Sequence, residues 1–229
     1  MTTIDAIQGR VAGVVDQDQD TANIASTDYA LRLSYINRRE QMWAESGKWQ
    51  ALIKEFNTLT STNTANTSVS LPADFRTLSS FPKITYDGVT TEAFPEIRPQ
   101  EEGQFDPVSS RYIKILGNPY TGYTMVVNPA TTSKFLASGA SIKVIYFSTP
   151  TSHASPANST FCPNPEYLVQ GVIADVWEAR EDARYQAKQV EANLILQNMI
   201  EFENTPSEAA YNRQVKTIDS TRFAFRWGR

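Results

Sequence analysis

Hydrophobic residues recur at helical spacing in the first part of the chain. In residues 4–14 and again in residues 29–43, an apolar side chain returns at intervals of three, four or seven positions, which is the spacing of one face of an α-helix. Thr3 and the Ser-Thr-Asp sequence at residues 26–28 precede these two runs and are typical N-terminal caps. The pattern therefore predicts two amphipathic helices near the N-terminus.

The region after the second predicted helix is expected to stay helical for one further turn. Gly47 is available for a left-handed cap that would end the second helix. Residues 49–56 then place apolar side chains at the spacing of a short third helical turn. We therefore assign residues 1–56 to the N-terminal helices.

The middle of the chain, residues 57–148, has the pattern of a β-rich module. Residues 83–91 contain an Asp-Gly pair between two short β-prone runs, which is a strong hairpin signal. Residues 111–127 predict a second hairpin, with a longer loop around Gly117 to Gly122. Residues 142–147 are apolar on both faces apart from one lysine, which indicates a central strand.

The last part of the chain is again predicted to be helical. A Pro-rich connector ends at Asn164, which is placed to cap a helix that has Pro165 at its first position. One continuous helix is expected from Pro165 to about residue 204, and a capping-box sequence at residues 205–208 predicts a short final helix. The long helix is expected to bury one apolar stripe, formed by Val172, Val176, Ala179, Ala183, Ala187, Val190 and Leu194.

These segments together predict an α+β protein. We expect a helical bundle built from the N- and C-terminal helices, with an inserted antiparallel β-rich module and an extended C-terminal tail. The expected boundaries are 1–56 for the N-terminal helices, 57–148 for the β-rich module, 149–220 for the long and short C-terminal helices, and 221–229 for the tail.

Composition excludes several kinds of chemistry. The 229 residues include one Cys and one His, so the chain cannot form an internal disulfide or supply a Cys/His zinc site. With 21 basic against 25 acidic side chains, the formal net charge is −4, which argues against general binding to DNA or to an anionic membrane. The sequence predicts no secretory signal and no membrane span. We expect no metal, no cofactor and no enzymatic activity.

Two groups of residues offer alternatives to this non-enzymatic interpretation. His153 and Cys162 share one loop and could form a base and a nucleophile, although surface residues in a Pro- and Ser-rich loop are the expected explanation. Glu101, Glu102 and Asp106 could supply the paired carboxylates of a glycoside hydrolase. Three acids beside a glycine and a proline are more often a solvated turn.

The C-terminal tail has an unusual composition for a chain end. Three aromatic and three arginine side chains fall within nine residues, and this combination is typical of energetic hot spots in protein interfaces. An extended tail would place the aromatic side chains on one side, which suits docking in a groove or at a sheet edge. Folding back onto the chain's own core and stacking on single-stranded nucleic acid are the alternatives. The candidate docking residues are Arg222, Phe223, Phe225, Arg226, Trp227 and Arg229.

Short motifs in this layout resemble a known family. The sequence Tyr-Ile-Asn-Arg-Arg-Glu-Gln-Met-Trp at residues 35–43, followed by Trp49 and Leu52, is similar to the first helix of the head-to-tail connector proteins of tailed bacteriophages. Residues 71–76, Leu-Pro-Ala-Asp-Phe-Arg, resemble the signature of the β segment in those proteins, and the helix from Tyr167 onward resembles their long C-terminal helix. These proteins are also called adaptor, head-completion, gatekeeper or tail tubular A proteins.

The resemblance implies a structural protein at the head–tail junction of a virion, assembled in the bacterial cytoplasm. It implies a homo-oligomeric ring of about twelve subunits that docks on the portal protein, extends the channel for genomic DNA and carries a tail tube, nozzle or tail-fibre protein. DNA would pass through during ejection without sequence-specific binding. It further implies that the tail residues Arg222 to Arg229 reach into the portal. A tail-tube or tail-fibre attachment protein, and a carbohydrate-active enzyme domain, remain alternatives.

Overall fold

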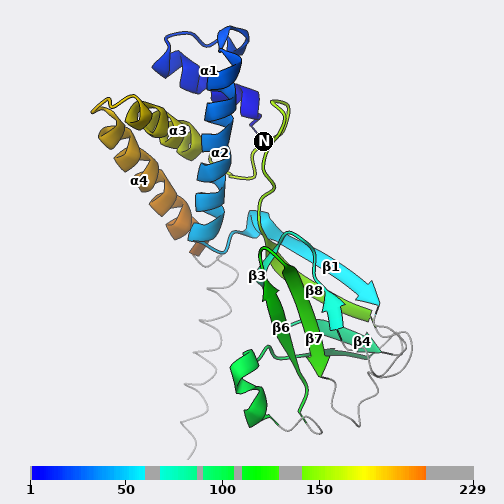
Figure 1. Cartoon of the computed structure of the whole chain (residues 1–229). Helices are drawn as coiled ribbons and strands as arrows, with labels where there is room; N and C mark the ends of the chain where they lie inside the picture. The colour runs from blue at the N-terminus through cyan, green and yellow to red at the C-terminus, as the bar shows by residue number, and fades with distance from the viewer. Residues whose placement is uncertain (1, 60–67, 87–89, 106–109, 129–140, 205–229) are drawn as a thin grey trace, which may run out of the picture. The chain divides into compact units, whose positions relative to one another are not determined.

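A computed structural model describes residues 2–59, 68–86, 90–105, 110–128 and 141–204 of the chain (Figure 1). It contains both helices and antiparallel strands, which confirms the predicted α+β class. The chain divides into two compact units, one formed by Met1–Gly47 with Ala154–Arg229 and the other by Lys48–His153. The α-helices lie in the first unit and the strands in the second.

The helical unit is arranged around α3 (Pro165–Ala179). The helices α1 (Ile4–Val15), α2 (Ser26–Ser46) and α4 (Tyr185–Asn204) all pack against it. Every residue from 167 to 177 of α3 is buried, because this stretch is apolar on all sides apart from Gln170 and Asp175, and such a helix needs neighbours on every face. The core of this unit is therefore centred on α3.

The predicted caps of α1 and α3 are confirmed, whereas the predicted cap and the predicted end of α2 are wrong. Thr3 accepts a hydrogen bond from the Ala6 N–H at 3.3 Å, and Asn164 accepts one from the Glu166 N–H at 3.1 Å. The helix α2 begins at Ser26, but its N-cap is Ala25 and no side chain caps it, so the cap predicted within residues 26–28 is wrong. Gly47 ends it with φ −162° and ψ −178°, so the chain leaves α2 in an extended conformation and not through the predicted left-handed cap.

The predicted long C-terminal helix is two helices, α3 and α4, and the second turns back beside the first (Figure 1). Glu181 adopts a left-handed conformation with φ 58°. The N–H of Asp182 then donates to the Trp177 carbonyl at 2.9 Å, and the Asp182 side chain accepts from the Arg184 N–H at 2.9 Å to start α4. This is a helix-ending motif with a non-glycine residue in the left-handed position.

The break also corrects the predicted buried stripe. Val172 and Val176 in α3 are buried, but Val190 and Leu194 in α4 are 68% and 57% exposed. The side of α4 that packs inward instead carries the buried Ala192 and the half-buried Ile195, Leu196 and Met199. Val190 and Leu194 therefore lie on an outward-facing side of α4.

The β unit contains two antiparallel sheets. In the first, β8 (Ser141–Ser148) lies between β1 (Ile53–Leu59) and β4 (Lys83–Tyr86), β5 (Thr90–Ala93) pairs with β4, and β3 (Phe75–Leu78) also pairs with β8. In the second, β7 (Gly122–Asn128) lies between β2 (Ser68–Ser70) and β6 (Tyr112–Asn118). The position of β8 confirms the predicted central strand.

Both predicted hairpins are present, and the third helical turn predicted for residues 49–56 is wrong. The strands β4 and β5 form one hairpin and β6 and β7 the other. The second hairpin closes more tightly than expected, because Asn118 pairs with Gly122 and Gly117 has φ 110°, where a Cβ would lie 2.1 Å from the Gly122 carbonyl oxygen. Residues 50–52 form a short 3₁₀ turn, and Ile53–Leu59 pairs with β8 as β1.

The two sheets share one hydrophobic core. Ile142, Val144 and Tyr146 of β8 and Phe75 of β3 belong to the same buried cluster as Ile113, Met125 and Val127 of the other sheet. The Leu-Pro-Ala-Asp-Phe motif lies in this core, with Leu71 and Phe75 buried. Its Asp74 carboxylate accepts hydrogen bonds from the Tyr146 hydroxyl at 2.9 Å and from Lys54 Nζ at 2.6 Å. The motif thus ties β1, β3 and β8 together.

Candidate interaction surfaces

The docking residues predicted in the C-terminal tail lie outside the described residues. This applies to Arg222, Phe223, Phe225, Arg226, Trp227 and Arg229, and to the short helix predicted from residue 205. The surfaces described below belong to the helical unit and the β unit.

His153 and Cys162 are buried, so the expectation that they are surface residues is wrong. Cys162 is inside the helical unit, its thiol donates to the Asn164 carbonyl at 3.3 Å, and burial raises the pKa of the thiol to about 12. A nucleophilic cysteine needs a lowered pKa and access to substrate. His153 belongs to the other unit. Cys162 therefore has neither the lowered pKa nor the exposure of a catalytic thiol.

The acidic cluster of the β unit is engaged in local structure. The Glu101 carboxylate accepts from the Arg98 N–H at 3.1 Å in the 3₁₀ helix Pro99–Gln104. Glu102 pairs with Lys114 at 2.6 Å, and this hydrogen bond lowers the pKa of Glu102. The general acid of a glycosidase needs a raised pKa, so Glu102 does not suit that role. Asp106 lies outside the described residues.

The described part of the chain shows neither a metal-binding cluster nor a membrane span. Across the described residues, no group of three or more His, Cys, Asp or Glu side chains could hold a metal ion. Among the helices whose placement is described, none combines the length and the apolar character needed to cross a membrane.

A buried ion pair fixes α2, α3 and α4 relative to one another. The Arg39 guanidinium donates to both carboxylate oxygens of Asp175, at 2.8 and 2.6 Å, and to Gln189 Oε1 at 2.7 Å. Burial opposes the charge on Arg39, but the hydrogen bonds and charge of Asp175 outweigh it, and the pKa of Arg39 is raised. Gly171 leaves room for this side chain, because a Cβ there would lie 3.0 Å from Arg39 Cδ.

The next residue of α2 holds the connector that leads into α3. Glu40 is buried, and one of its carboxylate oxygens accepts from the Thr160 hydroxyl and from the N–H groups of Phe161 and Cys162 at 2.6 and 3.1 Å. Arg39 and Glu40 both lie in the motif at residues 35–43. Their burial shows that this motif has a structural role inside the helical unit.

Sequence reasoning missed these buried charges, although a signal for them was present. Arg39 follows Ile36 by three positions and precedes Trp43 by four, so it lies on the apolar face of α2. Arg32 lies four positions before Ile36 and is buried as well. Charged residues at core positions of a helix indicate buried partners on the facing elements.

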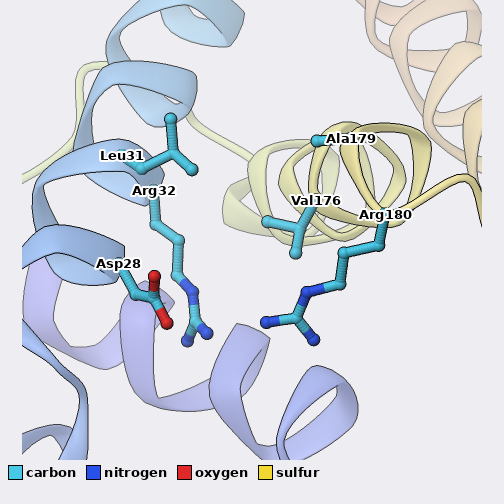
Figure 2. A pocket seen from close by; sticks show the side chains of 6 residues that line it. All are labelled: Asp28, Leu31, Arg32, Val176, Ala179 and Arg180. Carbon is cyan, nitrogen blue, oxygen red and sulfur yellow. The ribbon is translucent and has the colours of Figure 1, made fainter.

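A pocket of about 170 Å³ lies between the start of α2 and the end of α3 (Figure 2). Leu31, Val176 and Ala179 supply apolar walls, and Asp28, Arg32 and Arg180 supply charge. Both arginines also bind the Asp16 carboxylate, Arg180 at 3.2 Å. The pocket therefore has an apolar wall and a charged rim. The positive charges of the two arginines in that rim are partly neutralised by Asp16.

The helices α2 and α4 each present more than one large apolar side chain to solvent. On α4, Val190 and Leu194 lie one turn apart on the same exposed side, and the 81%-exposed Phe202 lies near the C-terminal end of the helix on another side. On α2, Leu31 and Met42 are exposed. Isolated exposed apolar side chains are ordinary, but adjacent ones on a helix, such as Val190 and Leu194, are typical of a protein interface.

The β unit exposes aromatic side chains of its own, and Phe81 and Tyr120 are the most exposed of those that the structure describes. Phe81 is exposed beside a shallow pocket lined by residues 78–81 and Glu96. Tyr120 is 97% exposed in the turn that joins β6 to β7. Both side chains are available to a protein partner.

Comparison with known proteins supports an assembly role. The model of the family described as SU10 adaptor protein matches residues 1–217, a range that includes both motifs at residues 35–43 and 71–76 and ends before the tail. No curated protein matches the chain.

Proposed function

The chain belongs to the SU10 adaptor protein family, and we propose that it forms a ring at the junction of a phage head and tail. The family is one of phage head–tail adaptors, so the chain is a structural component of the virion and interacts with other virion components. The proposed ring has about twelve copies, docks on the portal protein, extends the DNA channel and provides a platform for the tail.

The observation that carries this proposal is the family match over residues 1–217. The helical unit supports it, because its helices are fixed by the buried Arg39–Asp175 pair while α2 and α4 keep apolar side chains on their outer surfaces. A rigid scaffold with outward apolar faces suits a subunit that completes its packing by assembly. The net charge of −4 suits a conduit that must release DNA.

The C-terminal tail is the proposed portal anchor. Its aromatic and arginine side chains have the composition of interface hot spots, and it lies beyond the part of the chain that matches the family. Removal of residues 221–229 should weaken portal binding at least about tenfold while leaving the far-UV circular dichroism spectrum unchanged.

Purified portal protein and the full-length or truncated chain provide this test, with binding measured by surface plasmon resonance. A variant with Phe223, Phe225 and Trp227 replaced by Leu keeps the tail length and the arginines, and separates the aromatic contribution. Equal affinity of the full-length and truncated chains would disprove the anchor role. Failure of the full-length chain to bind portal would disprove the proposed docking itself.

A tail-tube or tail-fibre attachment protein is the second candidate, in which the β unit is the main binding surface. The exposed Tyr120 and Phe81 favour it. Replacement of both by Ser should then abolish binding to tail components, whereas removal of residues 221–229 should leave that binding unchanged. The opposite pattern would favour the portal-docking adaptor.

A further inference from the structure

We propose that a pocket in the β unit binds an arginine side chain of the tail component that the ring carries. The pocket is lined by Leu78, Ser79, Ser80, Phe81 and Glu96, and we call it the Phe81 pocket. The inference deepens the proposed function and rests on it, because it names the group through which the β unit would recognise its partner. The proposed portal anchor lies in the C-terminal segment, so the two contacts use different parts of the chain.

The aromatic wall of the Phe81 pocket stands on a fixed turn between β3 and β4. At the start of this turn, the Ser79 N–H donates to the Ile145 carbonyl at 2.9 Å. At its end, the Pro82 carbonyl accepts from the Phe94 N–H at 3.0 Å. Phe81 lies between these two bonds and is 59% exposed. An aromatic side chain on a rigid turn loses little conformational freedom when it binds a partner.

Glu96 lies on a second fixed segment of the same pocket. The Pro95 carbonyl accepts from the Ile113 N–H, and the Ile97 N–H donates to the carbonyl of the same residue, both at 2.9 Å. These two bonds attach the segment to β6 on either side of Glu96. The pocket has a volume of about 350 Å³, which is at the lower end of the range for ligand sites. Its walls are therefore held in place before any partner binds.

The charge of the Phe81 pocket is not balanced within the β unit. Glu96 is the charged residue that lines it, and among the described residues its carboxylate has neither an ion pair nor a hydrogen bond. Desolvation raises the pKa of Glu96. By contrast, Glu55 and Glu102 each accept a hydrogen bond from a lysine, which lowers the pKa of both carboxyl groups. A desolvated carboxylate without a counter-ion favours a cation supplied from outside.

An arginine side chain fits the aromatic wall and the carboxylate together. A guanidinium group is attracted to the face of an aromatic ring such as Phe81, and its planar fork can donate two hydrogen bonds to one carboxylate. Its methylene groups can pack on Leu78, whereas lysine offers a point charge and no planar face. The negative charge of Glu96 would repel a DNA phosphate. The pocket therefore suits a basic protein segment and not the genome.

Small probes test the pocket in the full-length chain without any partner. N-acetyl-arginine amide is the probe, and the citrulline analogue, which has a similar shape and no charge, is its control. In an NMR titration of the ¹⁵N-labelled chain, the arginine probe should shift the amide signals of residues 78–81 and 95–97. It should also bind at least about fivefold more tightly than the citrulline analogue.

Two matched variants show whether this preference depends on Glu96. Glu96→Gln should remove the preference for arginine over citrulline. Glu55→Gln, which neutralises another exposed acid of the same unit, should retain it. Circular dichroism checks that both variants fold. Equal affinity of the two probes for the wild-type chain, or a preference that survives Glu96→Gln, would overturn the assigned site.

Binding to the purified tail component tests the assigned partner. Glu96→Gln and Phe81→Leu should each weaken this binding at least about fivefold, and Glu55→Gln should leave it unchanged. Wild-type affinity of the first two variants would overturn the inference and leave the adaptor role standing. Failure of the wild-type chain to bind the tail component would contradict the proposed platform for the tail, and the inference with it.

The chain's own C-terminal arginines are an alternative occupant of the Phe81 pocket. If they filled it, removal of residues 221–229 would open the pocket and strengthen binding of the arginine probe. We expect the truncated and full-length chains to bind the probe with the same affinity. A gain of about fivefold or more on truncation would overturn the assignment to the tail component.

Discussion

Buried charged residues position the helices of this protein. Arg39, Glu40 and Asp175 are all buried, and each has charge-assisted hydrogen bonds to groups on another segment. Removing such charges from water costs several kcal/mol per ion, and hydrogen bonds to a well-placed partner offset that cost. These residues therefore favour one arrangement of α2, α3, α4 and the connector over other packings of the same apolar surfaces.

Breaking the buried pair on one side should be strongly destabilising. Arg39→Met leaves the Asp175 carboxylate buried without its partner and should lower the free energy of unfolding by about 3–5 kcal/mol. Urea unfolding followed by far-UV circular dichroism measures the change. Lys188→Met, which removes the more exposed pair with Glu191, is the control and should cost less than about 1 kcal/mol. Equal effects of the two substitutions would contradict the role given to Arg39.

The single thiol should be unreactive in the folded chain. With a pKa of about 12, only about one Cys162 side chain in ten thousand is a thiolate at pH 8, and burial also limits access. A chromogenic disulfide reagent should therefore modify Cys162 slowly in native buffer and within seconds in urea. Rapid modification of the native chain, at a rate close to that of free cysteine, would show that the connector does not bury the thiol.

At the scale of elements, local patterns predicted some structures correctly and failed where distant segments decide the outcome. The caps at Thr3 and Asn164 and both hairpins depend on neighbouring residues, and they were predicted correctly. Residues 53–56 have helical spacing, but they pair with β8 about ninety positions later. The break after α3 contains neither Gly nor Pro, since the left-handed residue is Glu181, so no ordinary signal marked it.

The turn between α3 and α4 should be improved by glycine. An L-residue in the left-handed region costs roughly 1–2 kcal/mol, and glycine avoids this cost while losing more conformational entropy on folding. We expect Glu181→Gly to raise the free energy of unfolding by up to about 1 kcal/mol. Glu178→Gly, three positions earlier in α3, should lower it. Chemical denaturation of both variants checks the prediction, and destabilisation by Glu181→Gly would contradict the assigned turn.

The link between β3 and β8 should weaken at high pH. Burial and the hydrogen bond to Asp74 raise the pKa of Tyr146 to about 12, above its ordinary value near 10. The folded chain therefore holds this proton more tightly than the unfolded chain. The resulting stabilisation is complete below pH 10 and is lost as the pH rises toward 12.

Tyr146→Phe isolates this effect from the other tyrosines. Wild type should be more stable than the variant at pH 8, because it has the hydrogen bond to Asp74, and that advantage should shrink by about 1 kcal/mol by pH 11. Denaturant unfolding at several pH values measures the difference. A constant difference between the two proteins across this range would contradict the contribution assigned to Tyr146.

At the scale of the whole molecule, the sequence predicted the fold class and the family. The α+β class followed from the change in hydrophobic spacing, and the family followed from the motifs at residues 35–43 and 71–76. The structure explains both motifs, because Arg39 and Glu40 hold the helical unit together and Asp74 links strands of the β unit. The exposure of apolar side chains on α2 and α4 could not be predicted, since it depends on which side of each helix the fold covers. The tail residues Arg222 to Arg229 remain a prediction.

The central claim is that this adaptor assembles in several copies on a portal, and native mass spectrometry of the full-length chain with purified portal protein tests it most directly. The proposed function predicts a complex in which one portal ring carries a complete set of adaptor subunits, about twelve, with few intermediate occupancies. A chain that stays monomeric in the presence of portal, with no mass corresponding to a bound complex, would contradict the account.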